Sequence, residues 1–138
     1  MKAMLEDIVC EASEDLFLHA KRIELVGSTY IYGGGNDIDI LVLLDRAIPL
    51  CPDVDALRLP GWEYGGSTPK SGDKWCSWKQ GIINILVTAD QTYFNDWVTA
   101  AEVCKYLFLK RGIVLDKPER IAVHEIIMVD KDCGDFAL

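Results

Sequence analysis

The feature that most constrains the fold of this chain is an apolar run that opens with two aspartates. Asp37-Ile38-Asp39-Ile40 alternates acidic and apolar residues, and Leu41-Val42-Leu43-Leu44 continues without a polar residue. Alternation is typical of a strand with one buried face, and a continuous apolar run is typical of a strand deep in the core. Residues 37–44 are therefore expected to form a strand that enters the core, with Asp37 and Asp39 projecting to the same side near its start.

The rest of the sequence predicts an α/β domain, with a small mixed sheet and about three helices, over residues 1–138. Helical periodicity covers residues 3–20 and 91–110, and a last helix is expected from Asp116 to about Met128, with Pro118 in its first turn. Further strands are expected at residues 23–27, 62–64, 74–79 and 81–88, the last two joined by Gln80-Gly81. Residues 45–61 are expected to form a connection with a helical turn near 54–57, and residues 65–73 a loop.

Composition excludes several classes of partner. The chain has 14 Lys and Arg against 22 Asp and Glu, a formal charge of −8, which argues against non-specific nucleic-acid binding and against an anionic membrane surface. Its apolar stretches are far shorter than the ~20 residues of a membrane-spanning helix, and its acidic N-terminus is unlike a signal peptide. The five cysteines are scattered, with no CxxC pair, so neither zinc nor disulfides are expected. This usage fits a reducing cytoplasm.

Two polar features ahead of the core indicate where chemistry could occur. Gly27-Ser28 ends the strand expected at residues 23–27, and Asp37 and Asp39 follow ten residues later, after a glycine cluster. Paired carboxylates provide hard oxygen ligands for Mg²⁺, and a Gly-Ser turn can bring backbone N–H groups and a hydroxyl close to phosphates. The alternative is that Asp37 and Asp39 form only a solvated strand edge.

This arrangement resembles a known superfamily. Gly27-Ser28, Tyr32-Gly33 and the run from Asn36 to Val42 are similar to the signature of the nucleotidyltransferase superfamily, the DNA polymerase β-like fold. Weaker similarity, in residues 83–88, Tyr93-Phe94 and Asp116 to Ile121, is to small proteins of tailed bacteriophages assigned as nucleotidyltransferases. The resemblance implies that Asp37 and Asp39 bind Mg²⁺ and that Gly27, Ser28 and Gly33 contact a nucleoside triphosphate. It also implies a host-cytoplasmic enzyme that attaches a nucleoside monophosphate to an acceptor hydroxyl and releases pyrophosphate.

The sequence departs from this family pattern in three places. Asn84 occupies the position of the third family carboxylate, and an amide carries no charge and cannot act as a base. The arginine that many small members place after Gly-Ser is missing, and the spacing from Gly27 to Asp37 is short. Proximity could let Glu63, Asp73 or Asp90 replace the third acid, although Asp90 is better explained as a helix cap. Lys79 is the cation expected nearest to the phosphates.

Three hypotheses follow. The first is a Mg²⁺-dependent nucleotidyltransferase with a protein or small-molecule acceptor. The second is a catalytically degenerate member that binds a nucleotide or a protein partner. The third is an interaction domain whose acids are only a solvated edge. Of the remaining polar and aromatic residues, His19 and His124 are expected to lie in helices without a catalytic triad. One of Trp75 and Trp78 is expected to face outward, because they lie three residues apart on a strand.

Overall fold

The structure is a computed structural model and describes residues 2–45, 59–67 and 75–128. These residues form a five-stranded sheet in the order β1-β2-β5-β4-β3. Strand β2 is parallel to β5, and the other neighbours are antiparallel. The strands are β1 (Ala20–Val26), β2 (Ile38–Leu44), β3 (Glu63–Ser67), β4 (Trp75–Gln80) and β5 (Ile83–Thr88). The helices are α1 (Lys2–Ala12), α2 (Glu14–His19), α3 (Gly27–Tyr32), α4 (Gln91–Arg111) and α5 (Lys117–Ile127). The expected mixed α/β fold is confirmed.

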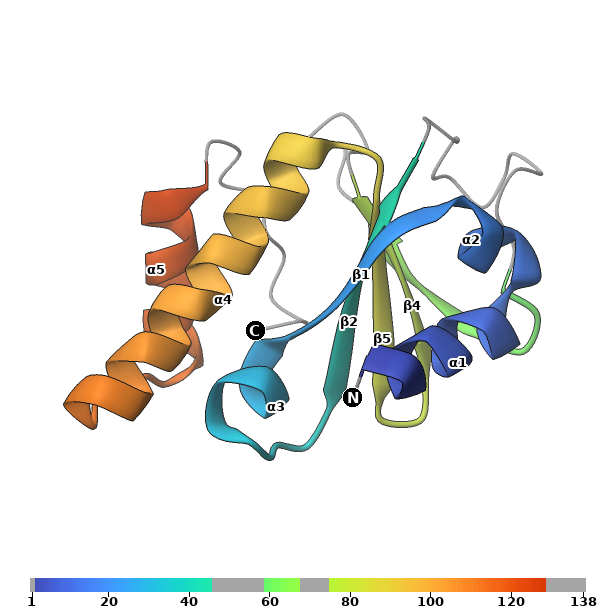
Figure 1. Cartoon of the computed structure of the whole chain (residues 1–138). Coiled ribbons are helices and arrows are strands. Elements are labelled where there is room, and N and C mark those ends of the chain that lie inside the picture. The colour runs from blue at the N-terminus through green and yellow to red at the C-terminus, as the bar shows by residue number, and fades with distance from the viewer. Residues whose placement is uncertain (1, 46–58, 68–74, 129–138) are drawn as a thin grey trace.

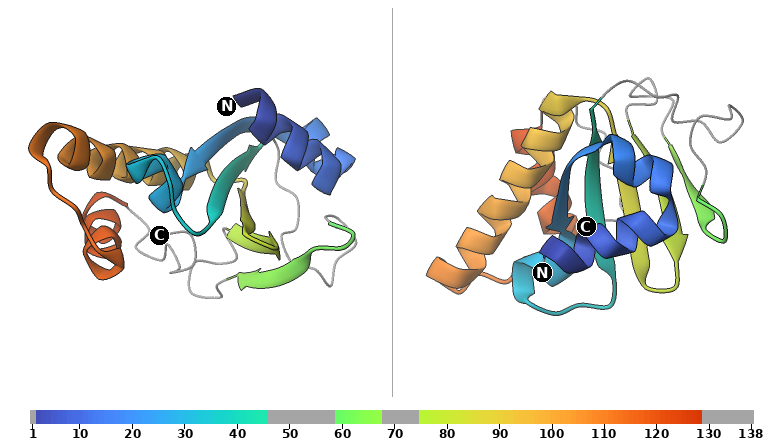
Figure 2. Two further views of the ribbon diagram at one scale, coloured as in Figure 1. Left: turned by 90° about the horizontal axis from the view of Figure 1, so that it is seen from below. Right: turned by 45° about the vertical axis from the view of Figure 1, so that its right-hand side comes forward.

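Helices cover both faces of the sheet (Figures 1 and 2). On one face, Leu5 and Val9 of α1 and Leu16 of α2 pack against Ile40 and Ile85. On the other face, three aromatic residues of α4 pack against Val26, Leu41 and Leu86: Tyr93, Phe94 and Trp97. Strand β2 is buried along almost its whole length because it lies inside the sheet and is covered from both sides.

Caps in the sequence explain where the long helices begin and end. Asp90 caps α4 by accepting a hydrogen bond from the Tyr93 N–H, and Gly112 ends the helix in the left-handed conformation. Asp116 begins α5 with a capping box, in which its side chain accepts from the Glu119 N–H and the Glu119 side chain accepts from the Asp116 N–H. Both helices, and the β4–β5 hairpin at Gly81, are where the sequence predicts them.

The N-terminal half differs from the prediction in two places. The single helix expected over residues 3–20 is two helices, because Ser13 is extended and its hydroxyl accepts a hydrogen bond from the Leu16 N–H as the cap of α2. The described residues contain five helices and not about three, since Gly27-Ser28 opens the short helix α3. Gly33 ends α3 with φ of 78°, a conformation that favours glycine.

Smaller differences concern the middle of the chain. Residues 65–67 belong to β3 rather than to a loop, while the turn expected near 54–57 lies outside the described residues. Trp75 and Trp78 point to opposite faces of β4 and are both buried, so the expectation that one of them faces outward is wrong. The reason is that both faces of the sheet are covered. Among the described helices, none has the length and apolar character needed to cross a membrane.

Candidate functional site

A row of polar residues crosses the sheet at the end next to α3. Strand pairing sets Asp39 of β2 beside Asn84 of β5, Asn84 beside Lys79 of β4, and Lys79 beside Glu63 of β3. Asp39 is also paired with Val26, the last residue of β1, whose side chain packs on the α4 face. Paired residues point to the same face, so the whole polar row lies on the α4 face. We call Asp39, Asn84, Lys79 and Glu63 the polar row.

Asp39 is the most buried carboxylate of this row, with 3 % of its surface exposed. Its Oδ1 accepts a hydrogen bond of 2.8 Å from Nδ2 of Asn84, which is itself buried. The pKa of Asp39 is raised to about 6, mainly because burial disfavours the charged form and to a lesser extent because Asp37 is negative. The Asn84 hydrogen bond and the charges of Lys117 and Lys79 act in the opposite direction and limit the increase. A carboxylate in this position is costly to ionise unless a cation accompanies it.

Asp37 lies immediately before β2 and is half-buried. Its backbone carbonyl accepts a hydrogen bond of 2.5 Å from the Thr29 hydroxyl of α3, which fixes the start of β2 against the first turn of that helix. The glycine loop, residues 33–36 between α3 and Asp37, passes close to the same turn. A Cβ atom on Gly35 would lie 2.5 Å from Oγ of Ser28, so only glycine fits there without movement. Ser28 therefore faces the loop that leads into Asp37.

Two cations complete the surroundings of Asp39. Lys79 is exposed on β4, two strands from Asp39, and Lys117 is exposed at the first position of α5. Both lie near enough to lower the pKa of Asp39. Sequence reasoning identified Lys79 but missed Lys117 as part of this site, because no pattern in the sequence shows that the start of α5 returns to the start of β2.

The carboxylates fit a magnesium ion held together with a phosphate ligand. Mg²⁺ is commonly bound through one or two carboxylates, with substrate phosphates and water filling the other positions. Asp37 and Asp39 could provide two such carboxylates, and a bound cation would relieve the electrostatic repulsion between them. Within residues 2–45, 59–67 and 75–128, no group of three or more His, Cys, Asp and Glu could hold a metal. The polar side chain hydrogen-bonded to Asp39 is the Asn84 amide.

None of the other residues considered for this site that the structure describes is shown in contact with Asp39. Asp90 follows the far end of β5 and caps α4, as its sequence context predicts. Glu63 stands at the outer end of the polar row, separated from Asn84 by Lys79. Asp73 lies outside the described residues. Gly33 ends α3, and the glycine that approaches Ser28 is Gly35.

Comparison with known proteins adds no assignment. No family model, no curated protein and no solved structure matches the chain.

Proposed function

We propose that this chain is a Mg²⁺-dependent nucleotidyltransferase that uses the start of β2 as its nucleotide site. One observation supports the proposal: buried Asp39 on β2 is hydrogen-bonded to Asn84 on β5, and Asp37 and two lysines lie close enough to shift its pKa. The glycine loop that leads into Asp37 contacts Ser28. Carboxylates beside cations suit a ligand that combines a metal ion with phosphates. A solvated strand edge does not account for the burial of Asp39.

In this proposal each residue has a distinct role. Asp37 and Asp39 would hold Mg²⁺, which supplies stabilisation of the negative charge that develops on the phosphates. Lys79 and Lys117 attract the triphosphate, and the Ser28 hydroxyl is able to donate a hydrogen bond to a phosphate oxygen. The acceptor hydroxyl oxygen bonds to the α-phosphorus while the bond to the bridging oxygen of pyrophosphate breaks, and the hydroxyl proton passes to water. Asn84 orients Asp39 through its hydrogen bond and takes no proton.

Transfer of radioactive label tests the activity. The wild-type chain is incubated with Mg²⁺ and each of ATP, CTP, GTP and UTP labelled at the α-phosphate, with the proteins and metabolites of a cell lysate as acceptors. The proposal predicts label on an acceptor with one nucleotide, and loss of at least about a hundredfold of the rate in Asp37→Asn. Asp7→Asn, an exposed change on α1, is the matched control and is expected to retain full activity.

A second function is favoured by Asn84. The buried neighbour of Asp39 is an amide, so the site has one negative charge fewer than three carboxylates would give. Such a site favours nucleotide binding without transfer. The Asn84→Asp variant distinguishes the two functions: a binding-only protein gains transfer activity when the third carboxylate is introduced, whereas an active enzyme labels its acceptor in the wild-type form. If neither form binds or transfers a nucleotide, both proposals fail.

A further inference from the structure

Strand β1 forms one edge of the sheet, and its residues Ala20–Leu25 line a groove that has two parts. The larger part, about 410 Å³, is lined by Ile23–Leu25 of β1 together with Leu5 of α1, Tyr30 of α3 and Lys105 of α4. The second part, about 230 Å³, extends along Ala20–Glu24 beside Phe17 of α2. Both parts share Ile23 and Glu24, so they form one groove that follows the strand.

The outer edge of β1 has no partner strand among the described residues. Figure 1 shows β1 at the front of the molecule, between α4 on one side and α1 on the other. An edge strand carries backbone N–H and C=O groups that point away from the sheet and are available to another strand. Half-buried Leu25 and Tyr30 give the groove apolar contacts for the side chains of such a strand.

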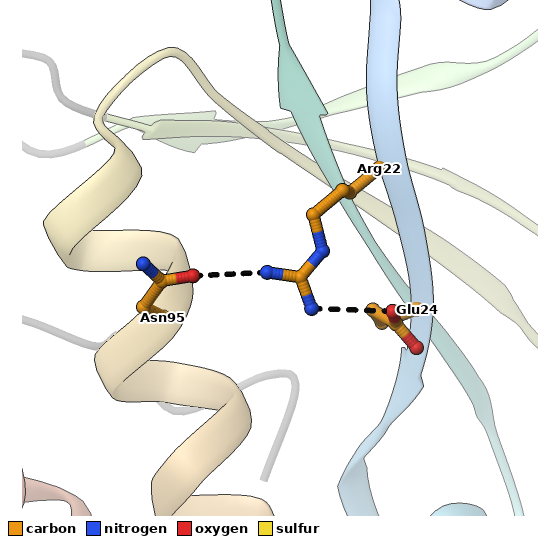
Figure 3. Close-up of polar contacts among 3 residues, drawn as sticks. All are labelled: Arg22, Glu24 and Asn95. Carbon is orange, nitrogen blue, oxygen red and sulfur yellow. Dashed lines mark hydrogen bonds and ion pairs between the residues drawn. The ribbon is translucent and has the colours of Figure 1, made fainter.

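The charges on β1 change sign at its centre. Lys21 and Arg22 precede Ile23, and Glu24 follows it. Arg22 and Glu24 lie on the same face, with Nη2 of Arg22 3.3 Å from Oε1 of Glu24 and Nη1 donating a hydrogen bond of 2.9 Å to Oδ1 of Asn95 (Figure 3). Their side chains remain 41 % and 40 % exposed, so both are accessible to a second strand.

We propose that β1 pairs antiparallel with β1 of a second copy of this chain, around a two-fold axis at Ile23. Antiparallel pairing centred on Ile23 places Arg22 opposite Glu24 of the second copy, and Glu24 opposite its Arg22. Opposite charges that face each other across paired strands stabilise the pairing. The four side chains form a ring of alternating charge, and the two five-stranded sheets become continuous. The same pattern disfavours a parallel or shifted pairing, in which like charges meet.

Charge reversal tests this interface. The oligomeric state of the full chain is measured by analytical ultracentrifugation over a dilution series for the wild type, Arg22→Glu and Glu24→Arg. The wild type is expected to be dimeric, and each single variant should weaken the dimer by at least about tenfold, because like charges then face each other at both positions. Arg111→Glu, an exposed change at the end of α4, is the control and should leave the dimer unchanged.

Mixing the two single variants gives the decisive result. In the mixture, the acidic strand of one variant faces the basic strand of the other, so a heterodimer should form at concentrations at which each weakened variant alone is mainly monomeric. The double variant Arg22→Glu/Glu24→Arg should also dimerise, because it exchanges the two charges and retains the pairing. Thermal melting of each variant establishes that it is folded. A wild type that stays monomeric, or a dimer insensitive to these changes, overturns the proposal; the first outcome would leave the edge to an extended segment of another protein.

Discussion

Asp39 and His124 are both buried, both titratable and both on the α4 side of the sheet, yet their surroundings differ. Burial shifts both pKa values toward the neutral form, upward for Asp39 and downward for His124. Asp39 accepts a hydrogen bond from Asn84 and lies near Asp37 and two lysines. His124 is fully buried, and Nδ1 lies 2.8 Å from the Arg120 carbonyl of its own helix. Its ring packs edge-on against Trp97.

The difference shows that a shifted pKa does not by itself locate a functional site. Nε2 of His124 and Nε1 of Trp97 are buried without a hydrogen-bond partner among the described residues. The His124 ring contributes instead to the packing of α5 against α4, through its contact with Trp97. Asp39 instead joins a row of polar groups that continues to exposed Lys79. We therefore expect His124 to act on stability alone, and Asp39 to act on ligand binding at a cost in stability.

The largest expected effect is that of His124→Ala. Removing a fully buried ring leaves a cavity between α4 and α5, and we expect the free energy of unfolding to fall by about 3 kcal/mol. Urea denaturation measures this loss. The matched control is His19→Ala, where a partly exposed histidine lies 3.6 Å from Asp45, and the expected loss is below about 1 kcal/mol. Equal losses in the two variants would contradict the structural role of His124.

Asp39→Asn is expected to have the opposite sign. At pH 8 the carboxylate is ionised in a site where burial raises its pKa from 3.8 to about 6, so the neutral amide should raise the free energy of unfolding by about 2–3 kcal/mol. The same variant should lose Mg²⁺-dependent nucleotide binding. Asp7→Asn on the exposed face of α1 is the control for charge. An Asp39→Asn protein less stable than the wild type at pH 8 would contradict this account.

The two groups should also oppose each other in the pH dependence of stability. The raised pKa of Asp39 means that stability falls as pH rises from about 4 to 6, whereas the lowered pKa of His124 means that stability is lost as pH falls below 6.5. Relative to the wild type, Asp39→Asn should therefore gain about 1–2 kcal/mol of stability as the pH rises from about 4 to 6. His124→Ala should lose stability relative to the wild type as the pH rises toward 6.5, because only the wild type gains stability from the neutral histidine. Urea denaturation between pH 4 and 7.5 measures both profiles. Parallel profiles for the three proteins would show that neither group titrates as described.

The smallest effect is expected in the glycine loop. Gly35→Ala places a methyl group against the Ser28 hydroxyl, which should cost about 1 kcal/mol and weaken nucleotide binding about fivefold. Gly34→Ala is the matched control, since a Cβ atom there meets nothing within 4 Å. Ser28→Ala combined with Gly35→Ala should recover the lost stability but not the nucleotide affinity. Fluorescence melting and nucleotide titration separate these outcomes, and equal effects of the two glycine changes would exclude a role for the contact with Ser28.

Much of the fold could be predicted because it depends on local signals. The Asp90 and Asp116 caps, Gly112 and Gly81 each specify a helix end or a turn through neighbouring residues, and the structure confirms them. The break at Ser13 had a local signal that was overlooked, namely a serine followed by two acids, which is typical of a helix start. Helix α3 was missed because six residues are too few to show helical periodicity.

The site could be predicted only in part. Asp37 and Asp39 are close in sequence, so their proximity followed from the strand pattern. The pairing of Asp39 with Asn84 depends on the parallel register of β2 and β5, and the approach of Lys117 depends on how α5 packs. Both are tertiary properties. The burial of Asp39 also could not be predicted, since the alternation of acidic and apolar residues at the start of β2 is equally typical of a solvated face.

Calorimetric titration shows whether the start of β2 is a metal-dependent nucleotide site. The wild-type chain is titrated with ATP, CTP, GTP and UTP, each with Mg²⁺ or with EDTA. We expect at least one nucleotide to bind with Mg²⁺ and not with EDTA. Asp37→Asn and Asp39→Asn should both abolish the binding, and Asp7→Asn should retain it. Binding that persists in EDTA or in both site variants, or no binding of any of the four nucleotides, would contradict a metal-dependent nucleotide site at the start of β2.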